Sequence, residues 1–342
     1  MKTLQTNVDE TLRNLLTQGD TVSIHEQSIT DIESFMYQRL TSKKFRKTKM
    51  DDVCVARTKS AIHLRVSQNQ TLKVVYPQGG YKLWRFPSSP EADWAEFFNI
   101  AYMTEYLLPL ARNYQPGVEL VYYMHTLLME LHDNLTTAEI QEYVDSFQRL
   151  IDEFQKHLPK NFTISILRDV DIYERAEYFQ KLEEGKGKAA KKYASWPDAK
   201  KQDFIRMAEL NIKWKGKQDW TNLSEKERQQ KLYDAALYEM TASSSLERVM
   251  EQVKAPDNVL VFTKATKEFI GIGSTGTSMA KYWVGFGVLE TSKDGRLQPR
   301  ILTPSQYERT TKQQPVSVPV SLLNGRNFKE ILVFDTVLDF RK

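Results

Sequence analysis

The apolar residues in the middle of the chain follow two periodicities in turn. Short runs rich in branched and aromatic residues, as expected for buried strands, occur at 72–76, 118–123 and 162–167. Between them, the segments 91–107 and 136–154 carry apolar residues three and four positions apart, which is the spacing of an amphipathic helix. The order strand, helix, strand, helix, strand is typical of a parallel sheet with crossover helices. We therefore predict a Rossmann-like α/β fold with a mainly parallel sheet.

The residues before this unit predict an N-terminal helical segment at 1–60. Amphipathic helices are expected over 1–18 and 29–40, because apolar residues recur there at helical spacing. A further strand is predicted at 62–66, and a single α/β domain is expected to occupy 61–342. The first residues contain no continuous apolar run of the kind found in a secretory signal peptide, so we expect a cytoplasmic protein.

The second half of the chain departs from this alternation. Residues 174–254 are highly charged and predict a helical insertion into the α/β domain, with a turn at 183–188 where two glycines occur close together. Dipeptides ending in glycine at 294–295 and 324–325 suit hairpin turns. Strand candidates follow the insertion at 259–262, 269–272, 282–289, 316–322 and 330–339. The C-terminal part is therefore predicted to be strand-rich.

Composition supports a folded protein and excludes several functional classes. The chain has 342 residues, 41% of them hydrophobic, so it can bury a substantial core. Its 48 basic and 44 acidic residues leave a net charge of only +4, which makes nucleic acid an unfavoured partner. Nucleic-acid contact stays a weaker hypothesis for the basic runs at 43–49 and 186–192. No apolar stretch is long enough to suggest a membrane-spanning helix.

Cysteine and histidine positions argue against a metal site. Cys54 is the single cysteine, which excludes an intrachain disulfide and any multi-cysteine zinc site. His125 and His132 lack the spacing of a helical zinc motif, and we interpret both as ordinary core or surface residues. We therefore predict no metal and no resident cofactor.

The segment after the 72–76 strand combines cations with aromatic residues. Lys82 and Arg85 lie beside Trp84 and Phe86, between a glycine pair and a proline-rich stretch. Because loops at strand ends hold the ligands of α/β proteins, this arrangement predicts an anion-binding pocket. The alternative is that the two aromatic residues anchor the core and both cations are solvated.

A second polar segment also follows a predicted strand. Arg168, Asp169 and Asp171 come directly after the strand at 162–167, at the end where parallel sheets bind ligands. The two carboxylates are candidates for binding an ammonium or hydroxyl group. The alternative for Asp171 is that it caps a helix through 173–178.

The glycine- and hydroxyl-rich segment at 271–278 is a further phosphate candidate. Its backbone N–H groups, together with Ser274, Thr275 and Thr277, are suited to cradling a phosphate, and Lys281 adds positive charge. The segment lacks the Walker A spacing, and a hairpin turn with solvated hydroxyls is the alternative.

A series of short motifs occurs along the α/β part in a distinctive order. Pro77 precedes Lys82 by five positions, Asp93 and Glu96 follow at the start of a helix, and residues 114–117 read Y-Q-P-G before the next strand. This series resembles the isocyanide (isonitrile) synthase family, which has a strand running into P-x-x-P-x-K-S-P-N, then an aspartate and A-E at a helix start, then a Y-P-P-G turn.

The resemblance continues toward the C-terminus, with several motif elements replaced. The helix predicted at 136–154, the acidic strand end at 169–171, and the strand pair at 269–289 before the T-P element at 303–304 follow the family's order. The family's S-P-N is absent after the lysine. Its D-G-R element falls near 125–127 with none of the three residues kept, and its R-L-S-I-H segment lacks the arginine and the histidine here.

The resemblance implies a carbon–nitrogen transferase or lyase of secondary-metabolite biosynthesis. Its small-molecule substrates would be an amino acid and a phosphorylated ketose of the ribulose 5-phosphate type, which condense to give an isocyanide. In that reaction Lys82, Arg85 and Arg168 would supply charge for the phosphate, and Asp169 or Asp171 would bind the ammonium group. Lys82, if buried, is an alternative base. The replaced motif elements favour the alternative of a non-catalytic binding or interaction protein on the same α/β scaffold.

Overall fold

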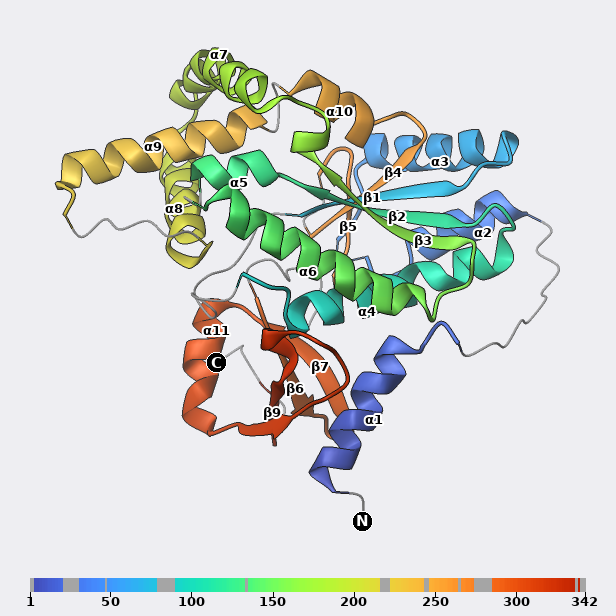
Figure 1. The fold of residues 1–342 in the computed structure, drawn as a ribbon. Helices are drawn as coiled ribbons and strands as arrows, with labels where there is room; N and C mark the ends of the chain where they lie inside the picture. The colour runs from blue at the N-terminus through green and yellow to red at the C-terminus, as the bar shows by residue number, and fades with distance from the viewer. Residues whose placement is uncertain are drawn as a thin grey trace.

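A five-stranded parallel sheet forms the centre of the molecule (Figure 1). Its strands are β1 (Leu72–Gln78), β2 (Val118–Met124), β3 (Phe162–Arg168), β4 (Asn258–Phe262) and β5 (Ile270–Gly271). The computed structural model describes residues 3–20, 31–46, 48–78, 90–132, 135–215, 222–242, 246–263, 266–273, 285–335 and 338. The predicted α/β class and the predicted order of the first three strands and their crossover helices are confirmed.

The strands lie in the order β3-β2-β1-β4-β5. β1 and β2 pair over their whole length, from Leu72 opposite Val118 to Gln78 opposite Met124, and β4 pairs along the other side of β1. Along the chain, β2 and then β3 are therefore added on one side of β1, and β4 and β5 are added on its other side. In open α/β sheets, ligands bind at the carboxyl ends of the strands where the order reverses. Here that point lies between β1 and β4.

Helices cover both faces of this sheet. In Figure 1, α4 (Trp94–Asn113) and α6 (Thr137–Gln155) run below it and α10 (Glu247–Val253) lies above it, while α3 (Asp52–Ser67) contributes buried residues to the same core as α4. Residues of β1 alternate between the two faces. Val74 and Tyr76 belong to the larger core, which includes α4 and α6, and Val75 belongs to a second core with α10.

The helix α4 is buried on nearly all sides because it lies between two sheets. Its apolar residues surround the helix instead of forming one stripe, and residues as far apart as Phe97 and Leu110 are fully buried. Asp93 begins it with a capping box, in which the Asp93 carboxylate accepts from the Ala95 amide and Glu96 accepts from the Asp93 amide. A capping box between Thr136 and Glu139 is likewise present at the start of α6.

The strand predicted at 62–66 is wrong, because these residues belong to α3. Asp51 caps this helix by accepting a hydrogen bond from the Val53 amide at 2.9 Å. Cys54, Thr58, Ala61 and Ile62 are buried, which is helical spacing that the short run Ile62–Val66 alone does not reveal. The helical N-terminal region thus extends to Ser67. It also contains α1 (Leu4–Leu16) and α2 (Ile32–Leu40).

The predicted helical insertion is present between β3 and β4. It consists of α7 (Arg175–Ala194), α8 (Asp198–Lys215), α9 (Glu225–Ala242) and α10. The turn predicted at 183–188 is wrong, since these residues continue through α7. A glycine inside a helix costs about 1 kcal/mol, but Gly185 is buried and the Lys186 ammonium pairs with Asp234 of α9 at 2.9 Å. Contact with α9 therefore offsets the local preference for a turn.

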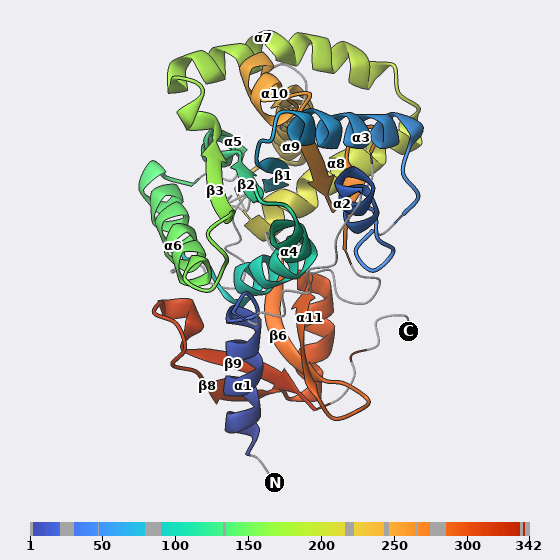
Figure 2. The same ribbon diagram turned by 90° about the vertical axis from the view of Figure 1, so that its right-hand side faces the viewer.

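The C-terminal strands form a second, four-stranded sheet in the order β7-β6-β9-β8, below α4 in Figure 1 and in the turned view of Figure 2. Its elements are β6 (Phe286–Thr291), β7 (Leu297–Leu302), α11 (Pro304–Thr310), β8 (Val316–Pro319) and β9 (Glu330–Phe334). The hairpin expected around 294–295 joins β6 to β7. The turn expected at 324–325 instead leads into a 3₁₀ helix at Arg326–Phe328 before β9. Another 3₁₀ helix, Thr311–Gln313, follows α11.

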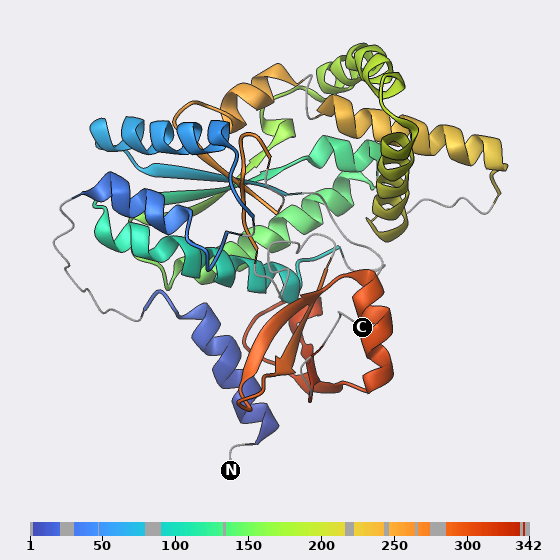
Figure 3. The same cartoon turned by 180° about the vertical axis from the view of Figure 1, so that it is seen from behind.

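The two sheets meet at the start of α4. An ideal Cβ on Gly287 of β6 would lie 2.4 Å from the backbone carbon of Trp94, so glycine allows this close approach. The Trp94 indole donates a hydrogen bond to the Glu330 carbonyl of β9 at 2.7 Å. Seen from behind in Figure 3, the second sheet and α11 lie beneath the helices of the first. The strand-rich C-terminal part is thus fixed to the α/β core.

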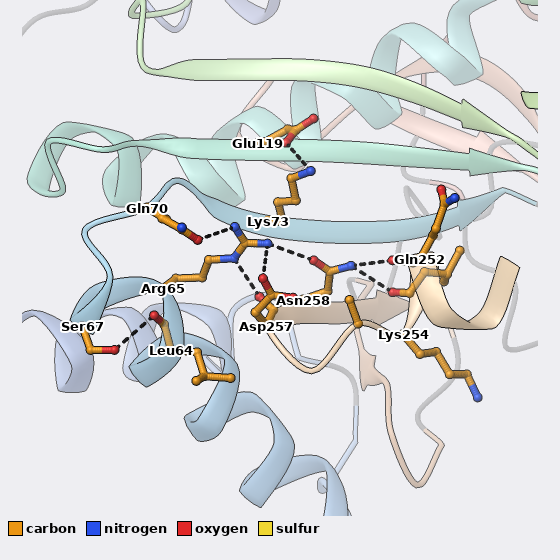
Figure 4. Close-up of polar contacts among 12 residues, drawn as sticks. Leu64, Arg65, Ser67, Gln70, Lys73, Glu119, Gln252, Lys254, Asp257 and Asn258 are labelled. Carbon is orange, nitrogen blue, oxygen red and sulfur yellow. Dashed lines mark hydrogen bonds and ion pairs between the residues drawn. The ribbon is translucent and has the colours of Figure 1, made fainter. Parts of the chain in front are cut away.

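Ion pairs close the amino-terminal edge of the parallel sheet (Figure 4). Arg65, near the end of α3, contacts the Asp257 carboxylate at 2.7 Å and donates to the Asp257 carbonyl at 3.1 Å. Asn258 donates to the Gln252 carbonyl at 2.8 Å, and Lys73 pairs with a neighbouring strand residue, Glu119, at 3.3 Å. The polar groups at this edge have structural partners within the chain.

Replacing Gly117 by alanine should destabilise the protein by about 2–3 kcal/mol. Gly117 has a φ of +80°, and an ideal Cβ there would lie 1.8 Å from the carbonyl oxygen of Asn161, which accepts a hydrogen bond from the Val118 amide. Gly295 is the matched control, because its φ is +78° and a Cβ would meet nothing within 4 Å. Gly295→Ala should cost only about 1 kcal/mol in urea denaturation. Equal losses in the two variants would contradict the steric explanation.

Candidate functional site

All the predicted site residues come from segments that leave the carboxyl edge of the parallel sheet. Lys82 and Arg85 follow β1 in the sequence, Ser274, Thr275, Thr277 and Lys281 follow β5, and Arg168, Asp169 and Asp171 lie at the end of β3 and directly after it. The residues after β1 and β5 lie outside the described part of the structure, so their roles stay predictions. The residues after β3 are described.

Asp169 is a fully buried carboxylate at this edge. Its Oδ1 accepts a hydrogen bond from the Thr126 hydroxyl at 2.5 Å, from the Leu127 amide at 3.0 Å and from the Val170 amide at 2.9 Å. Thr126 and Leu127 begin α5 (Thr126–His132), which directly follows β2. Asp169 thus joins the segments that leave β2 and β3. Because its side chain is 0% exposed, it is satisfied by the chain itself and is not accessible to an ammonium group from solvent.

The environment of Asp169 disfavours its charge. Burial raises its pKa from 3.8 to about 6, and the hydrogen bonds from Thr126, Leu127 and Val170 act in the opposite direction. The Tyr178 phenol also favours the charged form, although it makes no hydrogen bond of standard geometry. Burial raises the pKa of that phenol well above its usual value, so it stays protonated. The Asp169 carboxylate thus links the segments that follow β2 and β3, and its perturbed pKa makes this edge a candidate functional site.

Arg168 and Asp171 form an ion pair with each other across a short 3₁₀ helix (Asp169–Asp171). The Arg168 guanidinium contacts Asp171 at 2.6 Å, and the Arg168 amide donates to the same carboxylate at 3.0 Å. This bonding with Asp171 raises the pKa of Arg168. The interpretation that Asp171 caps a following helix is wrong, because α7 begins at Arg175 with Glu174 as its N-cap.

His125 is a further edge residue, which we interpreted from the sequence as an ordinary core or surface side chain. It follows Met124, the last residue of β2, and Met124 lies opposite Gln78, the last residue of β1. The hydroxyl of Tyr123 lies 3.2 Å from its Nδ1. Burial, followed by the negative charge of Asp169, raises the pKa of Tyr123 well above its usual value. The phenol therefore stays neutral and holds the imidazole in one orientation.

The signal for His125 was available in the sequence. Asp169 lies two residues after the strand at 162–167, and His125 lies two residues after the strand at 118–123. Histidine is the residue most often used for proton transfer in catalysis. The decisive information is the parallel pairing of β1 with β2, which brings His125 beside the end of β1.

Buried polar side chains underlie the same end of β1 and β2. The Tyr122 hydroxyl donates to the Asn99 amide oxygen at 2.8 Å, and the Tyr143 hydroxyl donates to the Glu96 carboxylate at 3.2 Å. Burial raises the pKa of Tyr122 well above its usual value. These pairs connect the sheet to α4 and α6 and give the edge a rigid, polar support on its lower face.

Within the described ranges, no group of three or more histidine, cysteine, aspartate or glutamate side chains is arranged to hold a metal ion. None of the helices described is long and apolar enough to cross a bilayer.

Comparison with known proteins identifies a shared fold. No protein-family model matches this chain, and no curated protein matches its sequence. Among solved structures, the crystal structure of the PvcA protein from Pseudomonas aeruginosa is similar, with a TM-score of 0.65 and 12% sequence identity. The similarity covers 89% of this chain and all of PvcA. At this identity the comparison establishes the fold, which this chain shares with PvcA over nearly its whole length.

Proposed function

We propose that this protein is an isocyanide-synthase-like enzyme that condenses the amine of an amino acid with the carbonyl of a phosphorylated ketose. The main support is the carboxyl edge of the parallel sheet, where the order of strands reverses between β1 and β4. The segments that carry the phosphate and proton-transfer candidates leave this edge. The motif order of the sequence and the fold shared with PvcA support the same assignment.

The first chemical step would be formation of an imine. The amine nitrogen attacks the ketose carbonyl carbon, and the carbonyl oxygen leaves as water after receiving two protons. A base must take a proton from the ammonium group, and an acid must return it to the oxygen. We assign this exchange to the imidazole of His125. Since Tyr123 engages Nδ1, the transfer would use Nε2.

The charged groups of the substrates require separate partners. Lys82 and Arg85 are assigned to the phosphate, since they follow β1 by four and seven residues. Asp171 is the better candidate for the ammonium group, because Asp169 is buried and its Oδ1 accepts three internal hydrogen bonds. The hydroxyls of Ser274, Thr275 and Thr277, with Lys281, are proposed as a second phosphate contact.

Replacing Lys82 by methionine should weaken ribulose 5-phosphate binding by about tenfold to a hundredfold. A hydrogen bond to a charged group contributes about 1.5–3 kcal/mol, and methionine keeps the length of the side chain without its charge. Isothermal titration calorimetry measures the affinity. Lys73→Met is the matched control, since Lys73 precedes Lys82 by nine residues in the sequence, lies on β1 and pairs with Glu119. Equal affinities of wild type and Lys82→Met would remove Lys82 from the site.

A non-catalytic binding protein on the same scaffold is the second candidate. It is favoured by the replaced motif elements, including His125-Thr126-Leu127 at the position of the family's D-G-R. Incubation with ribulose 5-phosphate and individual amino acids, followed by mass spectrometry for isocyanides, separates the two functions. A protein that binds the phosphosugar but forms no isocyanide would be the binding protein.

A further inference from the structure

The basic run at 43–49 reaches the carboxyl end of β5, although the two are far apart in the sequence. Arg46 forms an isolated antiparallel bridge with Ile272, the residue that directly follows β5. Next to this bridge, the Gly273 amide donates a hydrogen bond to the Phe45 carbonyl at 2.9 Å. The Cα atoms of residues paired in this way lie about 4.5–5.5 Å apart. The function proposed above uses no residue of the N-terminal helical region, so this contact requires a separate explanation.

Packing of Phe45 against α4 fixes the backbone of this segment. The Phe45 side chain is buried, and its ring centroid lies 5.4 Å from that of Tyr102 and 4.9 Å from that of Tyr106. The Arg39 guanidinium of α2 lies 4.6 Å from the centre of the same ring, and its Nε donates to the Tyr106 carbonyl at 3.0 Å. The next residue, Arg46, is therefore held beside β5 by the packing of the core.

The bridge lies level with the end of β1. Val75 of β1 lies opposite Leu260 of β4, and Phe262, two residues later on β4, lies opposite Gly271, the last residue of β5. Adjacent strands are about 4.8 Å apart, so β5 lies about 10 Å from β1 across β4. A ligand bound where the strand order reverses, between β1 and β4, is therefore within about two strand spacings of Arg46.

Two backbone amides at the start of the glycine-rich segment 271–278 already have partners within the chain. The Ile272 amide donates to the Phe262 carbonyl at 2.8 Å, and the Gly273 amide makes the contact beside the bridge. Neither amide is available to cradle a phosphate, as the sequence had led us to expect of this segment. The hydroxyl residues proposed as a phosphate contact begin with Ser274, the next residue. A cationic side chain beside Gly273 would supply the donors that these two amides cannot.

Arg46 is the member of the basic run that fits this requirement. The Lys44 ammonium pairs with the Glu105 carboxylate of α4, and Lys43 and Lys49 are exposed. Arg46 is half-buried, and its guanidinium forms no ion pair with any residue in the part of the chain that the structure describes. Partial exclusion of water strengthens a charge-assisted hydrogen bond. The run is therefore not one continuous basic surface, and its half-buried cation suits a small anion better than a nucleic-acid strand.

We propose that Arg46 binds the phosphate group of the sugar substrate at the carboxyl end of β5. This inference rests on the proposed function and adds to it a residue from the N-terminal helical region. A planar guanidinium donates two parallel hydrogen bonds to phosphate oxygens. Together with the hydroxyls proposed within 274–277 and the Lys281 ammonium, it matches the three terminal oxygens of a phosphate better than the two oxygens of an amino-acid carboxylate.

Isothermal titration calorimetry with ribulose 5-phosphate tests the proposal. Arg46→Met should weaken the affinity about tenfold or more, which is the usual effect of losing a hydrogen bond to a charged group. Lys43→Met is the matched control, because it removes the same charge from an exposed residue of the same run. It should change the affinity less than about threefold, since exposed charges contribute little. Arg46→Lys keeps the charge without the paired donors and should lie between wild type and Arg46→Met. Circular dichroism should show that all three variants are folded like the wild type.

Arginine labelling with phenylglyoxal provides a second readout that does not depend on catalysis. Mass spectrometry of peptides from the labelled wild-type protein follows the modification of Arg46 alone. Ribulose 5-phosphate and inorganic phosphate should both slow this modification, and glycine, which has a carboxylate but no phosphate, should not. The proposal is overturned if Arg46→Met and Lys43→Met bind ribulose 5-phosphate alike. It is also overturned if neither phosphate compound protects Arg46, or if glycine protects it equally well.

These outcomes are distinct from a failure of the proposed function. If Lys82→Met weakens the binding of ribulose 5-phosphate and Arg46→Met does not, the role of Arg46 is overturned and the proposed function stands. If Arg46→Met weakens binding but the wild-type protein forms no isocyanide, Arg46 is a phosphate contact of a binding protein and the proposed catalysis is overturned.

Discussion

His125→Asn should lower the turnover number for isocyanide formation by about a hundredfold to ten-thousandfold, which is the usual contribution of a general acid–base residue. Asparagine retains hydrogen bonding but cannot exchange a proton near neutral pH. The affinity for ribulose 5-phosphate should stay within about threefold of wild type, because the phosphate contacts are assigned to other residues. Steady-state kinetics and calorimetry measure the two quantities separately.

The matched control for this variant is His63→Asn. His63 lies on α3 with its side chain 66% exposed, where it contacts Glu33 at 3.0 Å, and its loss should leave turnover unchanged. Tyr123→Phe should reduce turnover by about tenfold, since it removes only the hydroxyl that orients the imidazole. An unimpaired His125→Asn enzyme would exclude His125 as the acid–base residue. A similar loss in His63→Asn would point to a general defect.

Asp169→Ala should destabilise the fold by about 3 kcal/mol. Alanine removes the acceptor for the Thr126 hydroxyl and the Leu127 and Val170 amides, and each buried donor left unpaired costs about 1–3 kcal/mol. Relief of the buried negative charge offsets part of that loss. Asp169→Asn is the matched variant, because its amide oxygen can accept the same hydrogen bonds without a charge. Urea denaturation at pH 7 should rank wild type and Asp169→Asn well above Asp169→Ala.

The pH dependence of stability provides an independent test of the same residue. Burial raises the pKa of Asp169 from 3.8 to about 6, so the folded state holds this proton more tightly than the unfolded state. The stabilisation from this proton is complete below about pH 3.8 and is lost as the pH rises through about 6. The difference amounts to about 3 kcal/mol. Asp169→Asn lacks this dependence and should gain relative to wild type between pH 4 and 7. Parallel pH profiles would contradict the burial of a titrating carboxylate.

The central fold was predictable because its signals are local and repeated. The strands at 72–76, 118–123 and 162–167 are short apolar runs, and the helices between them carry apolar residues three and four positions apart, so the sequence pattern identifies both. The strand predicted at 62–66 failed because five apolar-rich residues fit either structure. Only the burial of Thr58 and Cys54, one and two turns before Ile62, identifies the helix. The turn predicted around Gly185 and Gly187 is wrong for a different reason. Contact between α7 and α9 outweighs the local preference of these glycines for a turn.

The sequence predicts where the candidate site lies better than it predicts the role of each residue in it. Because α/β proteins bind ligands at the carboxyl ends of their strands, the sequence predicts a site at this edge, and Arg168, Asp169 and Asp171 lie there. The burial of Asp169 depends on α5, whose first residues donate to its carboxylate from another part of the chain. Sequence spacing contains no information about that contact. For His125, the sequence shows that it follows a strand, and the pairing of β1 with β2 shows that it lies beside the end of β1.

The most direct test of the proposed function follows the nitrogen atom. Wild-type protein is incubated with ribulose 5-phosphate and each amino acid labelled with ¹⁵N, and the products are analysed by mass spectrometry. We predict an isocyanide that carries the label, formed by wild type and reduced at least a hundredfold in His125→Asn. The absence of any labelled isocyanide with all amino acids, from a protein that binds ribulose 5-phosphate, would contradict catalysis at the carboxyl edge and support the binding-protein alternative.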